Sequence, residues 1–261
     1  MSPGVPVEVI ATVALVIAVA GTVNGIAGFG FAVVGTTVLA TVLDPASAVV
    51  FMILPILAVN LTLVGELSST DLRTCGTRFA PLLVAATVGT VFGMTLLDRL
   101  PDAPLRLLLG GICLGFVLTA QRIQPLPALS GATDRCFVET PLAMAGVGGL
   151  SGLLFGATNV GVQIVAFVRS FDLSHGLFVG VVAMVFVGIN GLRVVVAGTL
   201  GLYPSVDLAL ASALAAVPAV AGVAVGSRLR GRVNERLRRG VVLGLLTVIG
   251  TRLMLVGAGL A

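Results

Sequence analysis

The stretch GTVNGIAGFGF (residues 21–31) divides an apolar run that extends from about Val5 to Leu43. One crossing of the hydrocarbon core needs about 20 helical residues, so this run is too long for a single membrane helix. We therefore predict two segments, residues 6–23 and 29–43, separated by a non-helical break at 24–28. Backbone that leaves the helix inside a bilayer has to be buried in protein or line a wet cavity. The break thus marks a candidate binding site.

The composition around this stretch is that of a membrane protein. Of the 261 residues, 57% are hydrophobic and only 10% are charged. A soluble domain carries about 25% charged residues, which form the polar coat that this chain lacks. The 34 glycines suit a bundle in which membrane helices approach closely through small residues. We predict an all-α, multi-pass membrane protein and not a soluble fold.

Short polar stretches divide the remaining chain into further apolar segments. A linker at 122–139, rich in proline and charge, separates a first repeat (1–121) from a second (140–261). The polar stretch from Ser68 to Arg78 closes the third segment. After the first two segments, the predicted segments are 46–65, 79–97 and 105–121 in the first repeat and 141–155, 160–169, 176–200, 207–226 and 239–258 in the second.

The two halves share landmarks in the same order. Gly152 follows Gly25 by 127 residues, Asp172 follows Asp44 by 128, and the Gly222–Gly226 pair follows Gly89–Gly93 by 133. Five segments per half is an odd number, so the second repeat would be inverted across the membrane. The inversion also holds if the first two segments of each half form a re-entrant hairpin. Inverted repeats are typical of secondary transporters, whose binding site lies between the halves.

Arginine placement predicts the orientation in the membrane. Five arginines lie between the last two segments, and alternation puts the linkers with Arg73, Arg78, Arg122 and Arg135 on the same side. The positive-inside rule makes that side cytoplasmic, so both termini are predicted to be extracytoplasmic in the plasma (inner) membrane. This bias also accounts for the basic pI of about 9.8, and no nucleic-acid partner is predicted.

A second interruption, GGLSGLLFGATNVGVQ (residues 148–163), occurs in the second repeat. Free N–H groups at the start of a half-helix carry partial positive charge and can bind an anion. Asparagine, serine, threonine and glutamine side chains would add directional hydrogen bonds. The candidate substrate-binding residues are Asn24, Gly25, Gly28, Gly30, Ser151, Gly152, Gly156, Thr158, Asn159, Gln163 and Arg193.

Arg193 is the clearest charge within an apolar segment. Such an arginine costs roughly 2.5–3.5 kcal/mol on insertion scales, so it faces the bundle or extends to the interface. Arg252 has a similar position in the last segment. No acidic residue falls clearly in mid-membrane, and Glu66 and Glu139 lie near segment ends. The coupling ion, H⁺ or Na⁺, therefore stays open, as does the oligomeric state. The spacing of the three cysteines predicts no metal site or cofactor.

The two interruptions resemble the signatures of a known family. NGIAGFGF (24–31) is similar to the first-repeat signature of the sulfite exporter TauE/SafE family, and SGLLFGATNVG (151–161) to the second. Arg106 and Arg238, each before the last helix of its half, also fit. Many members carry adjacent glycines where this chain has Ala157, Thr158 and Asn159, which leaves the substrate open. The resemblance, which includes 4-toluene sulfonate uptake permeases, implies transport of sulfite, sulfonates or related small anions.

These observations predict a transporter and not an enzyme. It would export its anion by alternating access, the two halves moving against each other around a central site. An anion channel is an alternative, because channels and carriers have similar compositions. Residues 149–152 also match the GxSG motif of rhomboid proteases, in which a histidine activates the serine. The single histidine, His175, lies in a short turn near a membrane surface, which argues against a protease.

Overall fold

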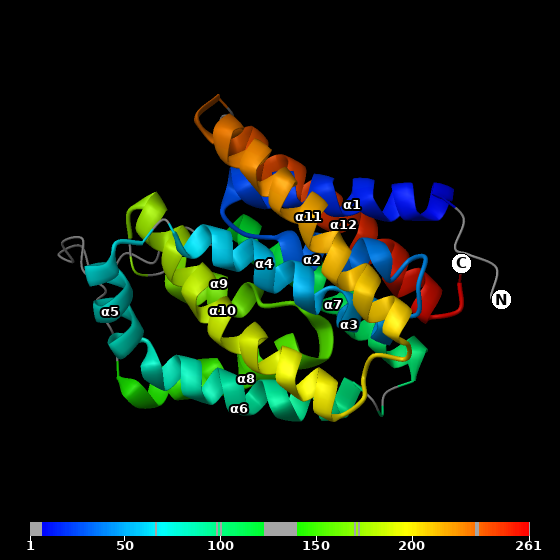
Figure 1. Ribbon diagram of the computed structural model, residues 1–261, viewed down its shortest axis with the longest axis horizontal. Helices are drawn as coiled ribbons and strands as arrows, with labels where there is room; N and C mark the ends of the chain where they lie inside the picture. Colours follow the sequence, from blue (N-terminus) through cyan, green and yellow to red (C-terminus); the bar gives the residue numbers. More distant parts are fainter. Residues whose placement is uncertain are drawn as a thin grey trace.

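The computed structural model describes residues 7–65, 67–97, 99, 101–122, 140–169, 171, 173–232 and 235–260. These residues form α-helices and one short 3-10 turn (Figure 1). The helices of the first half are α1 (Val7–Ala27), α2 (Phe31–Leu39), α3 (Pro45–Phe51), α4 (Ile53–Val64), α5 (Ser69–Arg78), α6 (Ala80–Leu97) and α7 (Asp102–Arg122). Those of the second half are α8 (Pro141–Thr158), α9 (Val162–Arg169), α10 (His175–Thr199), α11 (Val206–Leu229), the 3-10 turn η1 (Arg230–Arg232) and α12 (Glu235–Gly257).

The all-helical, multi-pass prediction is confirmed. Each of the ten predicted segments coincides with helix, the third as the pair α3 and α4, which meet at Met52. Within the described residues, six stretches are long and apolar enough to cross a membrane: Ile10–Ala27, Pro45–Val64, Ala80–Leu97, Pro141–Thr158, Gly176–Thr199 and Val206–Arg232. By contrast, α2 has 9 residues and α9 has 8, so each is a half-helix that spans only part of a bilayer.

Several sequence predictions fall on residues outside this description. They are the 123–139 part of the linker, Glu66 and Asp172, and the side chains of His175 and Arg238.

Helix α5 is an element that the apolar pattern did not predict. Its sequence is polar, so a search for membrane segments passes over it. Its start is nevertheless well defined, because the Ser68 side chain accepts a hydrogen bond from the Asp71 backbone N–H at 3.1 Å. Asp71 in the first turn and Arg78 in the last also complement the helix dipole. In Figure 1, α5 lies at the left, opposite the start of α1 and the end of α12 at the right.

The first helix of each half is broken, as predicted, but the first break lies later than expected. Residues 24–27 remain helical, and the chain departs at Gly28 (φ 82°) and Gly30 (φ 105°). These left-handed backbone angles suit glycine. The preceding turn stays helical, and Gly25 within it makes a close contact with α11. A Cβ atom added at Gly25 would overlap the Val223 carbonyl oxygen.

The two halves are paired crosswise through glycines. Helix α1 packs on α11, and α8 packs on α6. A Cβ at Gly21 or Gly25 would overlap the carbonyl oxygens of Ala219 and Val223; a Cβ at Gly152 or Gly156 would overlap those of Ala86 and Thr90. Each broken helix therefore lies against the fourth segment of the opposite half, with backbone packed directly on backbone.

These contacts match the broken helices α1 and α8 at a residue offset different from that of the Gly25–Gly152 landmark. Gly152 and Gly156 correspond to Gly21 and Gly25 at an offset of 131 residues. The sequence landmarks matched Gly152 to Gly25, at 127. The difference is one helical turn, because glycines recur every four residues and make successive turns look alike. In Figure 1, α6 begins beside α5 and α11 ends on that same left side, so the two helices run in opposite directions.

Candidate functional site

The break between α8 and α9 carries a buried polar side chain that is hydrogen-bonded to the first half of the chain. Asn159 is fully buried and has a left-handed backbone (φ 59°), and no other non-glycine residue has positive φ in the described part of the chain. Its Nδ2 donates to Thr36 Oγ1 at 2.9 Å and to the Val49 carbonyl oxygen at 2.8 Å. Asn159 thus joins the second-half break to helices α2 and α3 of the first half.

Asn159 has two roles that substitutions can distinguish: its backbone takes a left-handed conformation, and its side chain makes two hydrogen bonds. Replacing Asn159 with glycine should keep the backbone shape and lose both hydrogen bonds. Replacing it with alanine should lose the same bonds and add the left-handed penalty of about 1–2 kcal/mol. We expect Asn159→Ala to unfold at a lower temperature than Asn159→Gly in detergent. Equal or reversed unfolding temperatures would mean that the backbone at this position is not left-handed.

Five buried polar atoms around the bundle interior have no hydrogen-bond partner among the described residues. They are Asn159 Oδ1, Gln163 Oε1, Arg193 Nε, Arg193 Nη2 and Tyr203 Oη. Folded proteins leave very few buried polar atoms unpaired, so such a group indicates a ligand or water. Asn159 and Gln163 lie at the α8–α9 break, and Arg193 lies on α10. This set is the candidate site.

Arg193 supplies the positive charge of this site. Its exposed fraction is 0%, so of the two sequence-based alternatives the structure shows the interior one. Nη1 donates to Asn190 Oδ1 at 3.2 Å, and the guanidinium carbon lies 4.9 Å from the Phe155 ring centroid. Nε and Nη2 share one edge of the planar group and stay unpaired. A guanidinium edge of this kind matches two oxygens of an oxoanion.

Two aromatic rings connect Arg193 to the α8–α9 break. Phe155, one turn before Asn159 in α8, lies under the guanidinium, and its ring centroid is 5.0 Å from that of Phe186. A Cβ atom at Gly161 would overlap the Phe186 ring. The break therefore combines a buried cation, an aromatic wall and a glycine that leaves room for the wall.

The other predicted residues occupy different surroundings. Asn24 is buried and its Oδ1 accepts from the Phe31 N–H at 3.1 Å, which serves the start of α2. Thr158 Oγ1 accepts from the Val160 N–H at 3.2 Å within the second break. A Cβ at Gly30 would meet nothing within 4 Å, so the first break borders open space there. Gly25, Gly152, Gly156 and the buried Ser151 lie in helices, and the three glycines form the helix contacts described above.

Three residues of the site environment were not predicted from the sequence. Thr36 and Val49 become partners of Asn159 only through the fold, because they lie 123 and 110 residues away in the chain. Tyr203 is the single tyrosine of the chain, and this rarity could have drawn attention to it.

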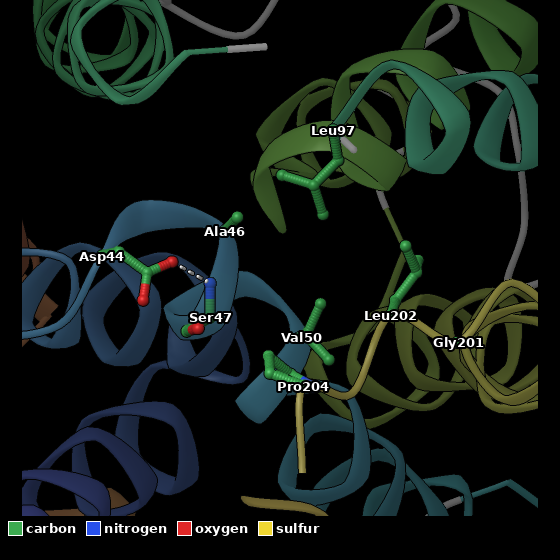
Figure 2. A pocket seen from close by; sticks show the side chains of 8 residues that line it. All are labelled: Asp44, Ala46, Ser47, Val50, Leu97, Gly201, Leu202 and Pro204. Carbon is green, nitrogen blue, oxygen red and sulfur yellow. Dashed lines mark hydrogen bonds between the residues drawn. The ribbon is translucent and has the colours of Figure 1, made fainter. Parts of the chain in front are cut away.

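A separate pocket of about 310 Å³ opens at one end of the bundle (Figure 2). It is lined by Asp44, Ala46, Ser47, Val50, Leu97, Gly201, Leu202 and Pro204. The Asp44 carboxylate accepts from the Ser47 N–H at 2.8 Å and so caps α3. None of the predicted site residues lines this pocket. It is formed by α3 and its N-cap, the last residue of α6 and the loop that follows α10.

The apolar helices define a multi-pass membrane protein. The chain belongs to the Sulfite exporter TauE/SafE family, whose family model matches residues 13–253, nearly its whole length. The resemblance noted in the sequence is thereby confirmed. The family is one of membrane transporters for sulfite and related sulfur-containing anions. No curated protein and no solved structure matches the chain.

Proposed function

We propose that this protein is a secondary transporter that exports a small oxoanion, such as sulfite or a sulfonate, across the plasma membrane. The observation that carries the proposal is the unpaired edge of Arg193, fully buried beside the α8–α9 break. A buried charge without a partner is unfavourable unless something neutralises it. No carboxylate of the described residues pairs with Arg193, so an anionic ligand is the fitting partner for its free edge.

The surroundings of Arg193 orient its free edge for binding. Asn190 holds one nitrogen of the guanidinium, and Phe155 covers one face. The remaining edge is preorganised for two oxygens of an anion, without a competing carboxylate in the described residues. Asn159 and Gln163 each present an unpaired oxygen, which can accept a hydrogen bond from a water or from a protonated anion such as bisulfite.

The helix packing supports alternating access between two units. Helices α1 and α11 form one glycine-packed pair, and α6 and α8 form the other. Each pair combines one helix from each half, so we propose that these mixed pairs, and not the two halves as such, move as units. The cytoplasmic side would be the one that carries α5 and η1, with both termini on the other side.

A counterflow experiment tests the proposal. Purified protein in liposomes loaded with unlabelled sulfite should take up external labelled sulfite above its equilibrium level for a limited time. A carrier exchanges one bound anion for another, whereas a channel does not show this overshoot. Binding can be ranked beforehand by thermal shift with sulfite, thiosulfate, sulfoacetate, taurine and simple carboxylates, because ligands of the folded state raise its unfolding temperature.

The chain suits a thiol-reactive dye for this thermal shift. It contains no tryptophan, and Cys113 is free and buried, so its thiol becomes reactive on unfolding. The proposal fails if no anion in the series raises the unfolding temperature and no exchange occurs. Uptake without counterflow would instead identify an anion channel.

A further inference from the structure

Helix α3 (Pro45–Phe51) is held at its C-terminal end by side chains from two distant segments. The last four carbonyl groups of a helix have no partner within the helix itself. Here the Val49 carbonyl oxygen accepts from Asn159 Nδ2 at 2.8 Å, and the Phe51 carbonyl oxygen accepts from Ser212 Oγ at 2.5 Å. All four residues are buried. The end of this short helix therefore depends on contacts from elsewhere in the chain.

The junction between α3 and α4 explains why the Phe51 carbonyl is free to accept from Ser212. Its regular helical partner would be the N–H of position 55, which is a proline and has none. Met52 separates the two helices, and its N–H reaches the Ala48 carbonyl oxygen at 3.3 Å. The junction thus lacks part of the backbone hydrogen bonding that makes a helix rigid, and it can act as a hinge.

The two side-chain hydrogen bonds connect α3 to different helix pairs. Asn159 directly follows α8, which packs on α6, whereas Ser212 lies in α11, which packs on α1. The proposed transport cycle moves these two pairs against each other. A hydrogen bond is lost once its donor and acceptor are more than about 3.5 Å apart, so a displacement of a few ångström breaks at least one of the two bonds. Helix α3 must then separate from one of the pairs.

Another face of α3 lines the surface pocket. Ala46, Ser47 and Val50 border it together with Leu97, the last residue of α6 (Figure 2). Because α6 begins beside α5, the pocket lies at the end of the bundle away from α5, which is the proposed extracytoplasmic side. One helix of seven residues thus borders the pocket with one face and contacts Asn159 with another.

We propose that α3 is the extracytoplasmic gate of the anion path. With both hydrogen bonds made, it closes the passage between the pocket and the α8–α9 break. When one bond is broken, it moves about Met52 and opens the passage, and the pocket is the vestibule through which the anion leaves. This inference rests on the proposed function. Ser212 is a positioning residue, which acts through α3 and does not touch the anion.

Cysteine labelling tests this gate in the purified protein without any anion. Val49 is fully buried, so the thiol of Val49→Cys should react slowly with N-ethylmaleimide, an uncharged reagent, and only while α3 is open. Adding Ser212→Ala leaves the buried Phe51 carbonyl unpaired, which makes the closed state less favourable and should raise that rate about tenfold. The reaction is followed by mass spectrometry of the peptide that contains position 49.

Three controls accompany this measurement. The thiol of Ser47→Cys borders the pocket and should react rapidly with either residue at position 212. Ser227→Ala is the same substitution about 22 Å further along α11, and it should leave the rate at position 49 unchanged. The native thiol of Cys113 is buried in α7, so its rate reports general unfolding and should not rise in Ser212→Ala.

Three results would overturn the gate. One is an unchanged rate at position 49 in Ser212→Ala. Another is a Val49→Cys thiol that already reacts as fast as the thiol of Ser47→Cys. The third is an equal rise at Cys113, because the whole bundle would then have loosened. Since the labelling needs no anion, these results are distinct from failure of the proposed function, which would appear as absent counterflow of sulfite.

Discussion

Replacement of Arg193 by methionine is expected to abolish anion binding and, at the same time, to raise the unfolding temperature of the empty protein. The two unpaired N–H groups would each form a charge-assisted hydrogen bond of about 1.5–3 kcal/mol with the anion. Losing both should weaken binding at least about 100-fold. The side chain is fully buried beside Phe155, so a methionine would replace a desolvated charge by an apolar chain of similar length. Comparable exchanges of buried ionic groups stabilise proteins by roughly 1–4 kcal/mol.

Loss of anion binding together with a higher unfolding temperature distinguishes a binding residue from a structural one. A residue that only supports the fold would lower both binding and stability when replaced. Thermal shift with and without sulfite, and counterflow in liposomes, measure the two effects separately. Arg252→Met in α12 is the control, because Arg252 is exposed and should change neither. Anion binding that survives in Arg193→Met would remove the central residue of the proposed site.

The second large effect concerns the packing of α8 on α6. A Cβ atom at Gly152 would overlap the carbonyl oxygen of Ala86 and crowd its backbone carbon atoms. Neither helix can yield without moving as a whole. We expect Gly152→Ala to destabilise the protein by about 3 kcal/mol, the upper range for overpacked cores. For a chain of this size that is a loss of about 6–12 °C in unfolding temperature.

The same helix offers a matched control. Gly146 also lies in α8, but it is exposed and a Cβ there would meet nothing within 4 Å. Gly146→Ala should be neutral or stabilising by up to about 1 kcal/mol, because alanine favours the helix. The measurement is the unfolding temperature of each variant in the same detergent. Similar temperatures for both would show that α6 and α8 are not in backbone contact.

Much of the architecture follows from the sequence because the bilayer restricts the alternatives. Few charges and long apolar runs permit only helices, and short polar stretches such as the one at Asp44 fix where those helices end. The second break was predicted near its observed place because the glycine-rich stretch at 148–163 interrupts an apolar run. Arg193 was recognised because a charge inside an apolar segment is rare.

The remaining features depend on contacts that no local pattern contains. Gly25 and Gly28 look alike in the sequence, but one packs against α11 and the other bends the chain. The match of Gly152 to Gly25 was therefore wrong by one helical turn. Helix α5 was not predicted because its sequence is mostly polar. Thr36 joins the site only because distant segments fold together.

The crosswise pairing of helices has a consequence for how the protein is made. As the ribosome delivers the chain, α1 enters the membrane long before its partner α11 has been synthesised, and its glycine-lined face must meanwhile contact lipid or the insertion machinery. The same holds for α6 until α8 emerges. Neither half can therefore mature as an independent folding unit, and the bundle closes only when nearly the whole polypeptide is present.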